Sequence, residues 1–106
     1  MKAPRITLSD LAVADILEQA DWYEAQANRM LAKRWEKAVG SALFRITQRP
    51  DAGSPCSFEA EELQGTRRVP VAGFSKHLVF YQSHGNEVLV LRVLHGARDL
   101  ESLFSD

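Results

Sequence analysis

The spacing of apolar residues changes once along this chain, near Pro50, and that change limits the fold more than any other feature. Before it, apolar side chains recur every three or four positions, which is the period of one face of an α-helix. After it, they form short runs rich in β-branched and aromatic residues, separated by glycine-containing turns. The sequence therefore predicts helices in the first half and strands in the second.

Two helices are predicted before the change of period. The first begins near Ser9 or Asp10, because either side chain accepts a free amide hydrogen of the first turn. The second ends near Arg49, because Pro50 disfavours helical geometry in the residue before it. The join at Ala27–Asn28 is short, so we expect an antiparallel hairpin. The predicted buried faces are Val13, Ile16, Leu17, Ala20 and Tyr23 on the first helix, and Leu31, Trp35, Ala38, Val39, Ala42 and Ile46 on the second.

Three strands are predicted after the change of period, at 68–71, 77–81 and 88–94, with a fourth short strand at 6–8. The last two strands form a hairpin through residues 83–86. The run 88–94 is almost wholly apolar, which is typical of a central strand. Proline at position 70 favours an edge strand or a bulge for its own strand.

This order of elements is typical of the α+β class. We expect a small, mostly antiparallel β-sheet (order β-α-α-β-β-β) with the N-terminal helical hairpin packed on one face. A length of 106 residues fits one domain spanning 1–106. We predict residues 51–55 to be loop, because their composition is that of a turn.

Charge is unevenly distributed although the net charge is only −1. The segment 10–24 carries acids without Lys or Arg, and the segment 29–49 is mainly basic, which we interpret as two complementary solvated helix surfaces. The near-zero net charge argues against a protein whose whole surface binds nucleic acid, but it is compatible with a local basic patch. Cys56 has no partner for an internal disulfide. With no apolar stretch of signal or membrane-spanning length, we expect a soluble cytoplasmic protein without a membrane partner.

Cationic side chains gather on the strand half, whereas three histidines and one cysteine give little support for a metal site or a cofactor. Alternation along the last strand predicts Leu89, Leu91 and Val93 beneath the helices. It places Val88, Val90 and Arg92 on the other face, where Arg67 or Arg68 and His77 join Arg92 to recognise phosphate or carboxylate. The alternative is that these arginines pair with acids, for which the candidates are Glu59, Glu61 and Glu62.

Three stretches of the chain together resemble the RelE/ParE superfamily of bacterial type II toxins. They are Leu91-Arg92-Val93-Leu94-His95-Gly96-Ala97-Arg98-Asp99-Leu100, Gly73-Phe74-Ser75-Lys76-His77-Leu78-Val79-Phe80-Tyr81 and Leu63-Gln64-Gly65-Thr66-Arg67-Arg68. The helical part also matches, through Leu8, Ala12, Asp15-Ile16, Trp22-Tyr23 and Arg49-Pro50-Asp51-Ala52-Gly53. The resemblance implies a small sheet packed against a helical hairpin, and a cognate antitoxin whose tail wraps the toxin.

Two branches of this superfamily differ in target. RelE-like members cleave messenger RNA on the ribosome with basic residues and often a tyrosine near the carboxyl end, whereas ParE-like members inhibit DNA gyrase. Against the RelE pattern, this chain keeps Arg68 and Arg98 but has His77, Pro70 and Phe104 where arginine, a basic residue and tyrosine are expected. The resemblance therefore implies a ParE-like toxin that is not an enzyme. The alternatives are a ribosome-dependent mRNA endonuclease using Arg68, His77 and Arg98, and a degenerate module that only binds an antitoxin.

On this interpretation the contacts fall into two predicted sets. The target-binding residues are Arg68, Lys76, His77, Arg92, His95, Arg98 and Phe104. The antitoxin-binding residues are Trp22, Phe58 and Leu63, which we expect to be exposed apolar side chains. No metal and no cofactor are predicted, and any contact with DNA is expected to be indirect, through the antitoxin.

Overall fold

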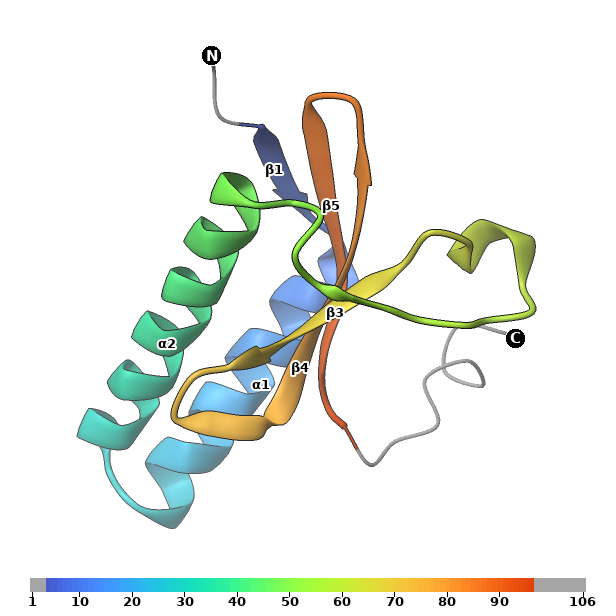
Figure 1. Cartoon of the computed structure of the whole chain (residues 1–106). Coiled ribbons are helices and arrows are strands. Elements are labelled where there is room, and N and C mark those ends of the chain that lie inside the picture. The colour runs from blue at the N-terminus through green and yellow to red at the C-terminus, as the bar shows by residue number, and fades with distance from the viewer. Residues whose placement is uncertain (1–3, 97–106) are drawn as a thin grey trace.

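The computed structural model describes residues 4–96, and in these the two predicted helices lie side by side on a twisted sheet (Figure 1). The elements in chain order are β1 (Arg5–Leu8), α1 (Asp10–Gln26), α2 (Arg29–Gln48), β2 (Ser54–Pro55), the 3-10 turn η1 (Glu61–Leu63), β3 (Arg67–Val71), β4 (Phe74–His84) and β5 (Glu87–His95). The α+β class and the order of helices and strands are as predicted. The two-residue strand β2 is an addition, because its segment was predicted to be loop.

Both helices begin at side chains that satisfy a free backbone amide. Ser9 Oγ accepts a hydrogen bond from the Ala12 amide at 3.0 Å, and Asn28 Oδ1 accepts one from the Leu31 amide at 2.8 Å. The Ser9 hydroxyl also donates to the carbonyl oxygen of Leu91 at 2.7 Å. The cap of α1 therefore also fixes the start of this helix against β5.

The strands form one sheet in the order β1-β5-β4-β3-β2. β1 runs parallel to β5, and the other neighbours are antiparallel. β5 lies between β1 and β4, which confirms the prediction of a central strand. Pro70 lies in β3 where β2 no longer pairs with it, beside a register shift between Pro70 and Val71, so both features expected of this proline are present.

The main core fills the space between the helical hairpin and one face of the sheet. Trp35 and Tyr81 are its largest fully buried side chains, and the indole nitrogen of Trp35 donates to the carbonyl oxygen of Ile16 at 3.0 Å. The predicted buried face of α2 is confirmed at Trp35, Val39, Ala42 and Ile46. On α1 the prediction is wrong at Val13 and Leu17, which are 42% and 55% exposed, because the helix packs through Ala12 and Ala20 and is turned away from those two residues.

The predicted alternation of β5 is right at Val93, which lies beneath the helices, and wrong at Val88 and Val90, which lie there too, because a bulge separates them from Val93. Arg92 lies opposite Phe80 but Val90 lies opposite Tyr81, so Leu91 is an extra residue on β5. One extra residue transfers every following side chain to the other face. Val88, Val90 and Val93 therefore all join the core beneath the helices, and Leu89, predicted to lie there, is exposed.

The opposite face of the sheet carries a second, smaller apolar cluster. Phe80 and Leu94 are its buried members, and Cys56, Phe58 and Leu78 pack against them. The long segment between β2 and β3 supplies Cys56 and Phe58, so this segment covers part of the face that the helices leave open. Among the described residues, no helix is both long and apolar enough to cross a membrane.

Candidate functional site

Arg92, a predicted target-binding residue, is bound to α1. Its guanidinium donates from Nε to Oδ2 and from Nη2 to Oδ1 of Asp15, both at 2.8 Å, and the Val93 amide donates to Oδ2 at 3.0 Å. The two side chains are 12% and 9% exposed. These hydrogen bonds raise the pKa of Arg92. The predicted free cation is therefore wrong at Arg92, because the pairing acid comes from a helix seventy-seven positions earlier in the chain.

The alternative of arginines paired with acids thus holds for Arg92, but with Asp15 as the partner. Arg67 instead donates from Nη1 to the carbonyl oxygen of Gly53 at 2.8 Å. This bond fixes Arg67 to the loop that follows α2. Arg67 and Arg92 therefore do not form the phosphate- or carboxylate-binding cluster that the sequence predicted on one face of the sheet.

His77 and His95 face each other across β4 and β5 and stack edge to face, with ring centroids 5.5 Å apart. The His77 ring also packs against Trp35, at a centroid distance of 4.8 Å. Burial and then the neighbouring His95 lower the pKa of His77 below 6.5, so its ring is neutral at neutral pH. His77 therefore lies on the helical side of the sheet as an uncharged aromatic contact.

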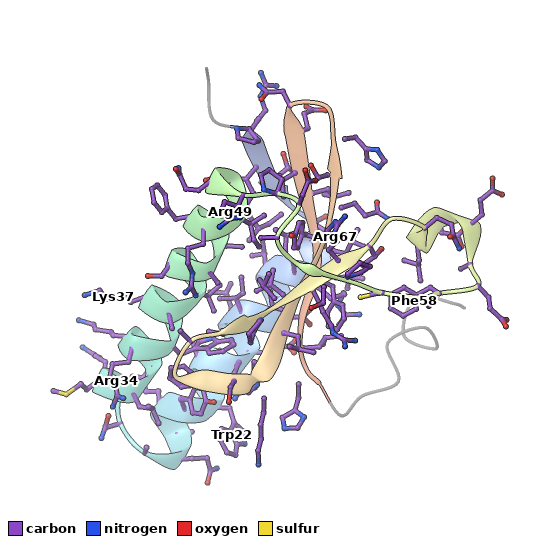
Figure 2. The ribbon with its side chains drawn as sticks, viewed as in Figure 1. Trp22, Arg34, Lys37, Arg49, Phe58 and Arg67 are labelled. Carbon is purple, nitrogen blue, oxygen red and sulfur yellow. The ribbon has the colours of Figure 1, made fainter. Side chains whose placement is uncertain are left out.

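An open groove of about 700 Å³ adjoins this histidine pair. Trp22 and Tyr23 of α1 form one wall, and the start of β4 from Phe74 to His77 forms the other. Lys76 and Trp22 are exposed along it, Trp22 by 55%. Figure 2 shows Trp22 near the end of α1 that adjoins the helical turn.

The groove brings together residues that the sequence assigned to two different partners. Lys76, His77 and His95 were predicted to bind the target, and Trp22 to bind the antitoxin. Sequence reasoning missed Gln19, Tyr23, Phe74 and Ser75, which also line the groove. One sequence signal could have identified this part of the groove. Phe74 directly follows the turn glycine Gly73, which places its aromatic ring at the start of β4, opposite α1.

The remaining predicted residues lie elsewhere. Arg68 is the cross-strand neighbour of Phe80 and lies close to the Cys56 thiol. Burial raises the pKa of this thiol, and the charge of Arg68 opposes the rise. Arg68 therefore lies on the face of the second apolar cluster. Phe58 is half-buried in that cluster, on the far side of the molecule from α2 (Figure 2). Leu63 is 3% exposed, so the expectation of an exposed docking side chain is wrong there, because η1 turns it inward.

Arg98 and Phe104 lie outside the described residues, so both stay predictions. Within residues 4–96, no group of three or more His, Cys, Asp and Glu side chains is arranged to hold a metal ion. The groove beside His77 is thus a surface of aromatic rings with an adjacent ammonium group. Such a surface suits binding to another macromolecule.

A family model described as the ParE toxin of the type II toxin-antitoxin system, parDE, matches residues 6–100. The chain belongs to the ParE toxin family. None of the curated protein sequences matches it. A solved structure described as the chromosomal ParDE TA system from P. aeruginosa has the same fold, with a TM-score of 0.72 and 16% sequence identity over 88% of this chain and 96% of that one. The ParE family thus agrees with the resemblance and with the observed hairpin on a sheet.

Proposed function

We propose that this ParE-family chain stops bacterial growth by binding DNA gyrase in the cytoplasm, and that a cognate antitoxin neutralises it. Its action on the target is binding and not catalysis. Membership of the ParE toxin family supports a role in a toxin-antitoxin pair. The choice between gyrase and ribosome rests on the placement of the cations.

The observation that carries this choice is that Arg68 and His77 are on opposite faces of the sheet. His77 shares the helical face with Val79 and Tyr81, and stacks on Trp35. Arg68 is the cross-strand neighbour of Phe80, which belongs to the cluster on the other face. The sheet therefore separates two of the three residues that a nuclease mechanism would assign to one phosphate.

Cleavage of RNA by attack of a ribose 2′-hydroxyl needs a base, an acid and positive charge converging on one phosphorus atom. His77 is half-buried and its pKa is lowered, which leaves it uncharged at neutral pH and unable to stabilise a phosphorane by charge. Arg92 is already neutralised by Asp15. These placements favour a binding mechanism over a ribosome-dependent nuclease.

The groove beside Trp22 is the surface that we assign to the target. Its exposed Lys76 supplies charge for recognition, and Trp22 supplies a large apolar contact. An antitoxin that covers Trp22 would block the same groove. Phe58 would be its second contact, so the antitoxin would have to reach both faces of the sheet, as a wrapping tail does.

Pulse-labelling of DNA and protein synthesis after induced expression tests this proposal. We expect DNA synthesis to fall first, and co-expression of the cognate antitoxin to restore it. The variant Lys76→Glu should lose most of this effect, and Arg68→Glu, an exposed cation on the other face, should keep it. An earlier fall in protein synthesis would contradict the proposal and favour the nuclease.

A further inference from the structure

The outer surface of the helical hairpin is unusually apolar for a surface open to solvent. Among the described residues, six of the seven exposed large hydrophobic side chains lie on α1 and α2, and Leu89 is the seventh. The six are Leu11, Val13, Leu17, Trp22, Met30 and Phe44. Trp22 lines the groove beside β4, so it does not belong to the outer surface. Phe44 is 65% exposed although it lies in the interior of α2, so most of its ring is open to solvent. Apolar side chains gathered in this way mark a docking surface.

The same surface is divided by charge. The exposed charged residues of α1 are all acidic, whereas those of α2 are basic except for Glu36. Figure 2 shows Arg34 and Lys37 pointing away from the sheet. In the described part of the chain, Glu24 and Arg29 form the one ion pair between the two helices, with a separation of 3.5 Å. Most of these charges are therefore not neutralised within the hairpin.

Acids and bases lie at matching heights along the two antiparallel helices. Asp21 and Arg34 are each six residues from the Ala27–Asn28 turn, and Asp10 and Arg45 are each seventeen residues from it. Each helical residue adds the same rise of about 1.5 Å, so each pair lies at one level. Apolar side chains occupy the levels between these two pairs: Val13 and Leu17 on α1, and Phe44 on α2.

We propose that this outer face is the interface of a homodimer, in which α1 of each copy lies antiparallel on α2 of the other. A two-fold axis parallel to the helices produces this arrangement. It places Asp21 over Arg34 and Asp10 over Arg45 of the second copy, twice in the dimer. A two-fold axis perpendicular to the helices would instead stack acid on acid and base on base.

A hollow on α2 is shaped to accept an apolar side chain from the second copy. It is lined by Lys37, Gly40, Ser41, Phe44 and Arg45 of α2 and by Ala72 of the turn between β3 and β4, so it lies on the flank of α2 that adjoins this turn. Gly40 has no side chain, and a Cβ atom added there would meet no other atom within 4 Å. Leu17 is ten residues from the turn, between the levels of Lys37 and Gly40, which are nine and twelve residues from it, so Leu17 of the second copy would enter the hollow beside Gly40.

Charge complementarity favours a second copy as the occupant. A partner with one sign of charge would satisfy only one helix, whereas a second copy presents both signs in the required order. Helices of 17 and 20 residues give each copy a face of about 500 Å², so the dimer would bury about 1,000 Å² in total, at the low end of specific interfaces. We therefore expect a dissociation constant in the micromolar range.

Sedimentation equilibrium on the full chain, made by cell-free synthesis, tests this proposal with two charge-reversed variants. One carries Asp10→Lys and Asp21→Lys on α1, and the other carries Arg34→Glu and Arg45→Glu on α2. Each variant alone should dimerise at least about tenfold more weakly than the parent, because like charges then face each other. An equimolar mixture should recover dimers of parental affinity, because each variant complements the other.

Three results would overturn the proposal: a parent chain that stays monomeric into the high micromolar range, a mixture that stays monomeric, or single variants that dimerise as tightly as the parent. The variant Leu17→Ser is a separate check that introduces no charge, and it should weaken the dimer at temperatures where circular dichroism shows the variant to be folded. If the parent is monomeric and Leu17→Ser weakens only antitoxin binding, the face belongs to the antitoxin. Circular dichroism melts of every variant separate lost association from lost folding.

Discussion

Asp15 of α1 holds Arg92 of β5 through two parallel hydrogen bonds of 2.8 Å, beyond the point where β1 stops pairing with β5. The same carboxylate accepts the Val93 amide at 3.0 Å. One side chain of the helix thus satisfies both the buried guanidinium and a backbone donor on the strand edge. The pair is a structural connection between helix and sheet.

Removing this carboxylate should destabilise the fold strongly. Asp15→Ala leaves a nearly buried guanidinium and a strand amide without an acceptor, so we expect a loss of about 3 kcal/mol in the free energy of unfolding. Urea denaturation measures this loss. Glu24→Ala is the matched control on the same helix, because its ion pair with Arg29 is exposed and should contribute less than about 0.5 kcal/mol. Equal losses in the two variants would contradict this assignment.

The loop after α2 depends on the buried phenol of Tyr81. Its hydroxyl accepts the Gly53 amide at 3.0 Å and donates to the carbonyl oxygen of Pro50 at 2.8 Å. Tyr81→Phe should therefore cost about 1–3 kcal/mol, since it leaves a buried amide without its acceptor. Thermal and urea denaturation measure the cost. A variant as stable as the parent would show that the loop is held by other contacts.

Gly53 should tolerate no side chain while Tyr81 is present. A Cβ atom at Gly53 would collide with the Tyr81 hydroxyl oxygen and lie 2.9 Å from its ring atom Cε1. Gly53→Ala should thus destabilise the parent more than it destabilises the Tyr81→Phe variant, because part of the collision is then gone. A double-mutant cycle measures this coupling. Additive losses would contradict a direct contact.

Burial also raises the pKa of the Tyr81 phenol above 10. An acid whose pKa is raised in the folded state stabilises the fold at pH values below its pKa in the unfolded chain. This contribution to stability is lost as the pH rises through its pKa in the folded chain. We expect the stability of the parent to fall above about pH 10 more steeply than that of Tyr81→Phe. Urea denaturation at a series of alkaline pH values measures both slopes, and equal slopes would contradict the prediction.

His77 should make the fold sensitive to acid. Its pKa is lowered below 6.5 by burial and by His95, so the unfolded chain binds the proton more readily than the folded chain. The contribution of His77 to the free energy of unfolding is complete at pH values above its pKa in the unfolded chain. It is lost as the pH falls through its pKa in the folded chain. Denaturation at a series of pH values below about 7 should show a decline that His77→Gln reduces. An unchanged decline would assign the acid sensitivity to other groups.

Much of the fold followed from local sequence pattern. The period of Trp35, Val39 and Ala42 defined the buried face of α2, and a proline after Arg49 marked its end. The position of β5 also followed, because the run from Val88 to Leu94 had no polar residue except Arg92. Such features depend on near neighbours in the chain, so one sequence is enough to predict them.

The candidate site followed less well, for two physical reasons. The bulge at Leu91 depends on pairing between β4 and β5, and without it Val93 and Val90 could not share one face. The Asp15–Arg92 pair joins residues far apart in the chain, whereas the candidate acids from the sequence, Glu59, Glu61 and Glu62, lie nearer to the strands in sequence. Tertiary contacts therefore decided which cations line the groove, and local pattern did not contain that information.

The most direct test of the central claim is a supercoiling assay with purified gyrase and the purified full chain, run beside a reconstituted translation reaction. We predict that the parent inhibits supercoiling and leaves messenger RNA intact, that Lys76→Glu inhibits at least about tenfold less, and that Arg68→Glu inhibits like the parent. Intact supercoiling together with cleaved messenger RNA would contradict the account.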